Sequence, residues 1–180
     1  MNIEMIEYPT DMDWMAAKRR ALVTVGKTPI TVPDVKWKRS ILEARHSPIR
    51  RLNFSFLLHD VPYCTSVHLV RHHEGCQPYV RSQRNDRQSA YDRKKAPQDA
   101  PVDMIWDMNA ETLMNIANKR LCVKAEEETR ALIRTICEMV DDSFEEFRGL
   151  LVPMCEWCGG LCHEMYPCGR YPAWSEVMRK

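Results

Sequence analysis

Apolar residues recur at every second position in the segment 52–58. Leu52, Phe54, Phe56 and Leu58 are separated by Asn53, Ser55 and Leu57. A period of two is typical of a β-strand that turns one face toward a core. We therefore expect a strand here.

Two helices are expected before this strand. The first runs through Trp14 to about Val25, because Asp11 or Asp13 can cap its start and Gly26 can close it. The second begins at Pro33-Asp34. Its apolar residues Val35, Ile41 and Leu42 are expected to face the core.

The rest of the chain is predicted to be mainly helical. A helix follows Asp60 and Pro62 and ends near Arg71, and two more are expected over about 109–120 and 122–141. The polar, proline-containing segment 85–102 is expected to be a loop. Together these elements predict a single, mainly helical domain of the α+β class.

The helix over 109–120 combines an apolar stripe with a polar face. Asn109 is its expected N-cap. Asn115 and Asn118 are three residues apart and share a face, with Arg120 about half a turn away. The alternative is an ordinary amphipathic helix with a polar outer face.

A basic cluster, Arg71-His72-His73, opens a loop that leads to Ser82-Gln83-Arg84. Charged side chains are rarely buried without partners. Arginine binds phosphate oxygens in bidentate geometry, and histidine adds a donor whose charge changes near neutral pH. The cluster therefore predicts a site for anionic groups, and a solvated basic loop is the alternative.

The composition limits the class of protein. The chain has 180 residues, of which 44% are hydrophobic and 28% charged, and its net charge is +1. These values indicate one globular domain and give no overall field for nucleic acid or an anionic membrane. No apolar run could span a bilayer, and the first eight residues do not resemble a signal peptide. We therefore expect a cytoplasmic protein.

Four of the eight cysteines lie in a short, turn-rich segment: Cys155, Cys158, Cys162 and Cys168. Four thiolates are the ligands that tetrahedral Zn²⁺ requires, so we expect a structural zinc site, with His163 as an alternative ligand. Free, partly buried thiols are the other interpretation. The remaining cysteines are expected mostly to pack in the core, although Cys76 is a candidate reactive thiol. The chain would thus divide into a core, 1–150, and a cysteine-rich tail, 151–180.

Taken in order, these segments resemble the flavin-dependent thymidylate synthases. That family has an Arg-His-Arg motif, a Ser-x-Arg motif, an asparagine-containing helix that ends in arginine, and an Ala-Gln-x-Glu-Ile-Arg segment. The corresponding segments here are Arg71-His72-His73, Ser82-Gln83-Arg84, 109–120 and 125–130. Upstream, 46–49 and 54–56 resemble the family's His-x-x-Pro and Phe-Thr-Phe segments. The resemblance covers about residues 14–140 and implies a small antiparallel sheet.

The resemblance also implies an activity and a site. Such an enzyme transfers a one-carbon unit from methylenetetrahydrofolate to C5 of dUMP, using FAD that NADPH reduces. By position, FAD would contact Arg71, His72, His73, Ser55, Asn109 and Asn115. The nucleotide would contact His68, Ser82, Arg84 and Arg120. Arg120 and Ser82 are the catalytic candidates, and Arg120 would stabilise charge that develops on the uracil ring. The family's sites lie between subunits of a homotetramer, and the same is expected here.

Several positions depart from the family pattern. His73 replaces the second arginine, Arg50-Arg51 replaces Glu-His, and the segment 85–108 is shortened and lacks a substrate-binding arginine. Two alternatives follow. One is a related flavoenzyme that modifies C5 of another pyrimidine nucleotide, for example by hydroxymethyl transfer. The other is a zinc-stabilised nucleic-acid-binding protein that uses the basic segment 81–95. The near-neutral charge argues against the second.

Overall fold

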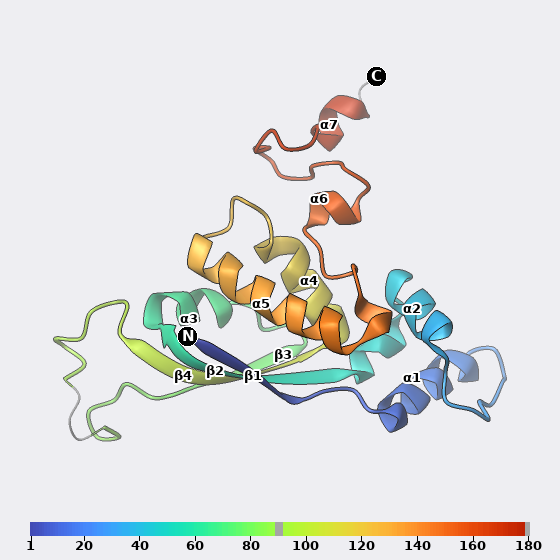
Figure 1. Ribbon diagram of the computed structural model, residues 1–180, viewed down its shortest axis with the longest axis horizontal. Coiled ribbons are helices and arrows are strands. Elements are labelled where there is room, and N and C mark those ends of the chain that lie inside the picture. The colour runs from blue at the N-terminus through green and yellow to red at the C-terminus, as the bar shows by residue number, and fades with distance from the viewer. Residues whose placement is uncertain (89–91, 179–180) are drawn as a thin grey trace.

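The computed structural model describes residues 1–88 and 92–178 and shows helices packed on a four-stranded antiparallel sheet (Figure 1). The strands are β1 (Asn2–Glu7), β2 (Asn53–Pro62), β3 (Cys76–Val80) and β4 (Pro101–Asn109), in the order β1-β2-β4-β3. The helices are α1 (Asp11–Val23), α2 (Val35–Glu43), α3 (Tyr63–Leu69), α4 (Ala110–Arg120), α5 (Glu127–Ser143), α6 (Met154–Trp157) and α7 (Trp174–Val177), with 3-10 turns η1 (Ser47–Arg51) and η2 (Glu145–Phe147). The predicted α+β class is confirmed.

The core lies between the two central strands and the helices α4 and α5. Phe54 and Phe56 of β2 and Trp106 of β4 are at most 1% exposed. The Phe54 ring packs edge-on against Phe147, with centroids 5.4 Å apart. Burial of each large apolar side chain stabilises the fold by roughly 1.5–3 kcal/mol. The strand predicted from the alternation at 52–58 is therefore present, and it continues to Pro62.

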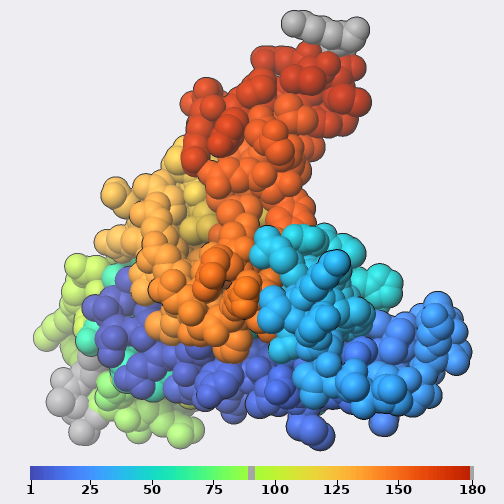
Figure 2. All heavy atoms as spheres, turned by 45° about the vertical axis from the view of Figure 1, so that its right-hand side comes forward, coloured from blue at the N-terminus to red at the C-terminus, as the bar shows by residue number. Residues whose placement is uncertain are grey.

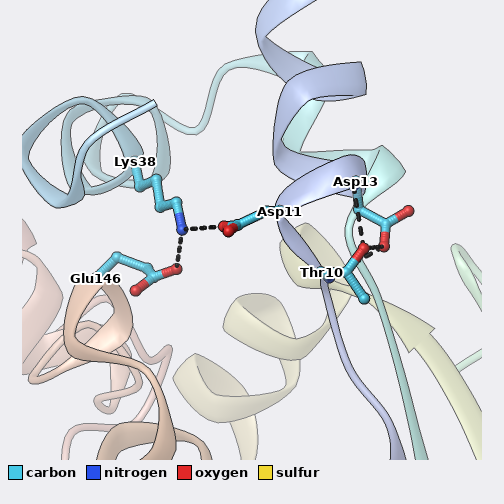
Figure 3. Close-up of polar contacts among 5 residues, drawn as sticks. All are labelled: Thr10, Asp11, Asp13, Lys38 and Glu146. Atoms are coloured by element: carbon cyan, nitrogen blue, oxygen red, sulfur yellow. Dashed lines mark hydrogen bonds and ion pairs between the residues drawn. The ribbon is translucent and has the colours of Figure 1, made fainter. Parts of the chain in front are cut away.

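The start of α1 differs from the prediction. Thr10, and neither Asp11 nor Asp13, is the N-cap: its hydroxyl accepts from the Asp13 N–H at 3.4 Å, and the Asp13 carboxylate accepts from the Thr10 N–H at 3.0 Å (Figure 3). This reciprocal pair is a capping box. Asp11 instead lies 3.5 Å from Lys38 of α2, whose ammonium also lies 3.6 Å from Glu146. One lysine thereby ties α1, α2 and η2 together.

Other boundaries also need correction. Asp34 caps α2 as expected, but Val35 at its first position is 38% exposed, because the buried side of this short helix is formed by Ile41 and Leu42. The helix expected over 122–141 begins at Glu127, since the Glu126 carboxylate accepts from the N–H groups of residues 128 and 129.

The segment 85–102 is not wholly a loop, because β4 begins at Pro101 and Val102 is 3% exposed. The sequence carries the signal of this strand: Val102, Met104, Trp106 and Met108 are buried at alternate positions. Asp60, expected near a helix start, lies in the left-handed region at φ 53°, at an irregularity of β2. The helix α3 consequently begins later, at Tyr63.

The C-terminal segment stands apart from the sheet. Figures 1 and 2 show α6 and α7 projecting beyond α4 and α5, in orange to red. Among the described residues, no helix combines the length and apolar character needed to cross a membrane.

Candidate functional site

The Arg71-His72-His73 cluster lies in the turn between α3 and β3, and this turn is fixed against the start of α4. Gly75 adopts φ +71°, and its carbonyl accepts from the Asn109 N–H at 3.0 Å. The Thr112 hydroxyl donates to the Glu74 carbonyl at 2.8 Å. A Cβ on Gly75 would lie 2.3 Å from Thr112 Oγ1 and 2.5 Å from Asn109 Nδ2. Only glycine allows the turn to lie this close to α4.

This close contact forms a pocket of about 200 Å³, which we call the loop pocket. Its lining includes Arg71, His72, His73, Thr112, Asn115 and Lys119. Four of the predicted flavin contacts therefore lie together. The guanidinium of Arg71 forms no hydrogen bond or ion pair with any residue that the structure describes, so it is available to an anion.

A second pocket, of about 340 Å³, lies at the C-terminal end of α4, and we call it the helix-end pocket. It is lined by His72, Lys119, Arg120, Cys122, Lys124 and Glu164, among others. His72 and Lys119 line both pockets, so the two sites adjoin.

His72, which lines both pockets, forms a hydrogen bond with Arg120 of the helix-end pocket. Arg120 Nε donates to His72 Nε2 over 2.8 Å. Burial, then the positive charge of Arg120 and the neighbouring His73, lowers the pKa of His72 below its usual range. His72 is therefore neutral at pH 7 and acts as the acceptor that orients Arg120.

Ser82 and Arg84 do not join this site within one chain. They line a separate, basic pocket of about 300 Å³ with Arg81 and Arg87, and it shares no residue with the other two pockets. Arg84 is held there by two hydrogen bonds to Asp86, at 2.9 and 2.8 Å. Ser82 and Arg84 are therefore separate from Arg120, another of the predicted nucleotide contacts.

Three further predicted residues lie outside both adjoining pockets. Ser55 is 3% exposed and donates to Asp107 on the neighbouring strand at 2.5 Å. The side-chain oxygen of Asn109 caps α4 by accepting from the Thr112 N–H at 2.9 Å. His68 lies in the last turn of α3, near Glu126. Burial alone would raise the pKa of Glu126. Hydrogen bonds from Thr129 and from the backbone, together with the nearby His68, outweigh burial and lower this pKa.

Arg50 and Arg51, which replace the family's Glu-His, each form an ion pair with an acidic residue. Arg50 Nε lies 2.6 Å from the Glu111 carboxylate, and Arg51 lies 3.3 Å from Asp13.

Cys76, the candidate reactive thiol, donates to the His72 carbonyl at 2.7 Å. Burial raises its pKa, which disfavours the thiolate that a nucleophile requires.

The four predicted zinc ligands all line one cavity of about 230 Å³ between the tail and the end of α4, with Cys122 and His163. Within residues 1–88 and 92–178, no three His, Cys, Asp or Glu side chains are arranged to hold a metal ion. All eight cysteines are free thiols. Of the four cysteines outside the tail, only Cys137 is buried in the core, where burial raises its pKa to about 12; Cys64, Cys76 and Cys122 are only partly buried, so the prediction that most of the four pack in the core is wrong.

The charged residues that line these pockets but were not predicted as site residues include Lys119, Lys124 and Glu164. Lys119 was detectable, because it precedes Arg120 in the last turn of the same helix. Glu164 gives no local signal, since only the fold of the tail brings it to the helix-end pocket.

Comparison with known proteins identifies the type of fold. Residues 91–144, which include β4, α4 and α5, match the family model described as thymidylate synthase complementing protein. The structure is similar to that of thymidylate synthase X from Helicobacter pylori with FAD and dUMP, with a TM-score of 0.64 and 14% identity over 84% of this chain and 97% of the other. It is also similar to a UMP/dUMP methylase, PolB from Streptomyces cacaoi bound with 5-Br dUMP, with a TM-score of 0.62 and 15% identity over 84% and 96%.

No curated protein matches the sequence. The fold is nevertheless that of the flavin-dependent thymidylate synthases. The resemblance stated above is therefore confirmed, in sequence over β4, α4 and α5 and in fold over most of the chain.

Proposed function

We propose that this protein is an FAD-dependent enzyme that transfers a one-carbon unit from methylenetetrahydrofolate to C5 of dUMP, with NADPH as the reductant. The observation that carries the proposal is the pair of adjoining pockets that share His72, whose ring accepts a hydrogen bond from Arg120 in the helix-end pocket. The similar structures from Helicobacter pylori, solved with FAD and dUMP, support it.

The loop pocket has the donors that a flavin dinucleotide needs. Arg71 and Lys119 offer positive charge to phosphate oxygens, and Asn115 offers an amide. Bound FAD would supply the redox chemistry, while these side chains would hold and orient it. A pocket of about 200 Å³ holds only part of such a molecule, so a neighbouring subunit would complete the site.

The helix-end pocket suits the nucleotide. Neutral His72 fixes the Nε side of Arg120, which leaves its terminal nitrogen atoms for a ligand. A positioned guanidinium stabilises negative charge that develops on the uracil ring. Lys119 and Lys124 add positive charge suited to the phosphate.

The separation of Arg84 from Arg120 favours a homotetramer with shared sites. If Ser82 and Arg84 of one subunit complete the helix-end pocket of another, Arg84→Ala and Arg120→Ala should each have strongly reduced activity alone. Mixed and reassembled, they should recover part of the activity, because some sites then contain neither substitution. Light scattering should show a tetramer. A fully active monomer would contradict this arrangement.

Substitution of Arg71 tests the loop pocket. A charge-assisted hydrogen bond contributes about 1.5–3 kcal/mol, so Arg71→Ala should weaken FAD binding roughly 10- to 100-fold. Titration followed by flavin fluorescence measures this. Arg19→Ala, at an exposed position of α1, is the matched control and should bind FAD normally. Equal FAD affinities of the two variants would show that Arg71 does not contact FAD.

We also propose that the tail, 151–180, is a separate unit from the 1–150 core and binds one structural Zn²⁺ through Cys155, Cys158, Cys162 and Cys168. These residues already line one cavity, and zinc would draw their thiolates together. Metal analysis should find one zinc per chain, and Cys158→Ser should lower the melting temperature more than it lowers the turnover of folded enzyme. Cys64→Ser should retain the metal. A protein that is stable without zinc, and is not stabilised by it, would refute this proposal.

A second candidate is a flavoenzyme that modifies C5 of a related pyrimidine nucleotide, for example by hydroxymethyl transfer. The similarity to a UMP/dUMP methylase and the change to His73 favour it. Turnover of UMP that exceeds turnover of dUMP would support this candidate.

Nucleic-acid binding is disfavoured by the net charge of +1.

A further inference from the structure

Arg45, which the sequence analysis did not select, bridges α4 and the C-terminal segment. Its Nη1 donates to Asn115 Oδ1 at 2.6 Å, and its Nη2 donates to Asn118 Oδ1. Its guanidinium lies over the Trp157 ring, 4.3 Å from the centroid. Asn118 is 1% exposed and donates in turn to the Val152 carbonyl at 2.7 Å. One side chain thus contacts the polar face of α4 and the first turn of the tail.

The backbone at Arg45 is unfavourable for an arginine. Arg45 has φ 48°, in the left-handed region, at the C-terminal end of α2. Its N–H donates to the Leu42 carbonyl at 2.9 Å, and the His46 N–H donates to the Ile41 carbonyl at 3.1 Å. These are the bonds of a Schellman motif, in which this position is usually glycine. The side chain, and not the backbone, therefore explains an arginine here.

The environment of the guanidinium also indicates a specific role. The Nε atom is enclosed without a hydrogen-bond partner among the described residues. An enclosed, incompletely paired guanidinium destabilises the fold unless its other contacts compensate. Those contacts are the two asparagine oxygens and the indole face.

We infer that Arg45 is a positioning residue that fixes the side chain of Asn115 for the ligand of the loop pocket. A guanidinium only donates, so it must face the amide oxygen of Asn115. This orientation leaves the Asn115 amide N–H₂ as a donor for the pocket that also contains Arg71 and His72. The inference rests on the proposed binding of FAD in that pocket.

A double-mutant cycle on FAD affinity tests the inference. Arg45→Gly removes the guanidinium and relieves the left-handed backbone, but it also leaves Asn118 Oδ1 without its partner, so the melting temperature is measured beside the FAD affinity. We expect FAD binding to weaken about 5- to 10-fold, the loss associated with one oriented hydrogen bond. Asn115→Ala should weaken FAD binding by about the same factor. The double variant should bind FAD no more weakly than whichever single variant has the lower affinity.

Two control variants separate positioning from general damage. Trp157→Ala removes the ring under the guanidinium and leaves both asparagine contacts, so it should lower the melting temperature but keep FAD affinity within about 2-fold. Arg39→Ala removes an arginine within α2, which bonds to Glu43 and to the Arg148 carbonyl, and should leave FAD affinity unchanged.

The outcomes are distinguishable. If the native protein binds no FAD, the proposed function fails, and this inference fails with it. If the native protein binds FAD but the effects of Arg45→Gly and Asn115→Ala add fully, or Arg45→Gly has no effect, only the role of Arg45 is refuted. An equal loss of affinity in Trp157→Ala would assign the effect to docking of the tail and would also refute it.

Discussion

Arg120→Ala should lower kcat and kcat/KM for dUMP together, on the order of 100-fold or more, by analogy with the removal of one oxyanion-hole donor. The physical reason is the position of this guanidinium in the helix-end pocket, where its hydrogen bond to neutral His72 holds it. In the proposed reaction, negative charge develops on the uracil ring in the transition state. Without the guanidinium this charge is not stabilised, so the variant destabilises the transition state and not the bound substrate. Steady-state kinetics with dUMP as the varied substrate measures the effect.

The same variant should keep its fold and its flavin. The lost bond to His72 should change the free energy of unfolding by about 1 kcal/mol, and FAD content should remain near normal. Arg134→Ala, which removes an exposed arginine of α5, is the control and should be fully active. Unchanged turnover of Arg120→Ala would show that this helix does not carry the proposed chemistry.

Gly75→Ala should be the most destabilising single substitution in the basic turn, at about 3 kcal/mol. A Cβ in the left-handed region costs roughly 1–2 kcal/mol, and overlap with packed neighbours adds about 1–3 kcal/mol. Here the new methyl group would overlap Thr112 Oγ1 and Asn109 Nδ2, which belong to the capped start of α4. The turn would have to move away from α4, so FAD affinity should fall as well. Urea unfolding measures the loss of stability.

Gly26→Ala provides a matched control. Gly26 has φ +68°, close to that of Gly75, but a Cβ there would meet no atom within 4 Å. It should therefore show only the backbone cost, about 1–2 kcal/mol. Equal destabilisation at the two glycines would mean that the turn does not depend on close packing against α4.

Local sequence patterns predicted the elements that have strong local signals. The alternation of Phe54, Phe56 and Leu58 marks β2, and Asn109 marks the start of α4. The alternation in β4 was equally clear, but it was overlooked because prolines at 97 and 101 suggested a loop. The strands β1 and β3 are short and partly exposed, so their identity depends on pairing with β2 and β4, which no local pattern encodes.

The candidate site was predicted in part. The basic turn and α4 carry Arg71, His72, Asn115 and Arg120, and the fold brings these together. Arg45 was not foreseeable, because its importance comes from contacts with Asn115 and Asn118, 70 and 73 residues away, and with the tail. The separation of Arg84 from Arg120 is likewise a property of the folded chain that no local pattern encodes.

The most direct test of the account is flavin analysis of the purified protein, combined with a turnover assay that supplies dUMP, methylenetetrahydrofolate and NADPH. The account predicts bound FAD that is reduced by NADPH, and product methylated at C5 of the nucleotide only when all three compounds are present. A protein that binds no FAD, even with FAD in excess, and shows no nucleotide-dependent turnover would contradict it.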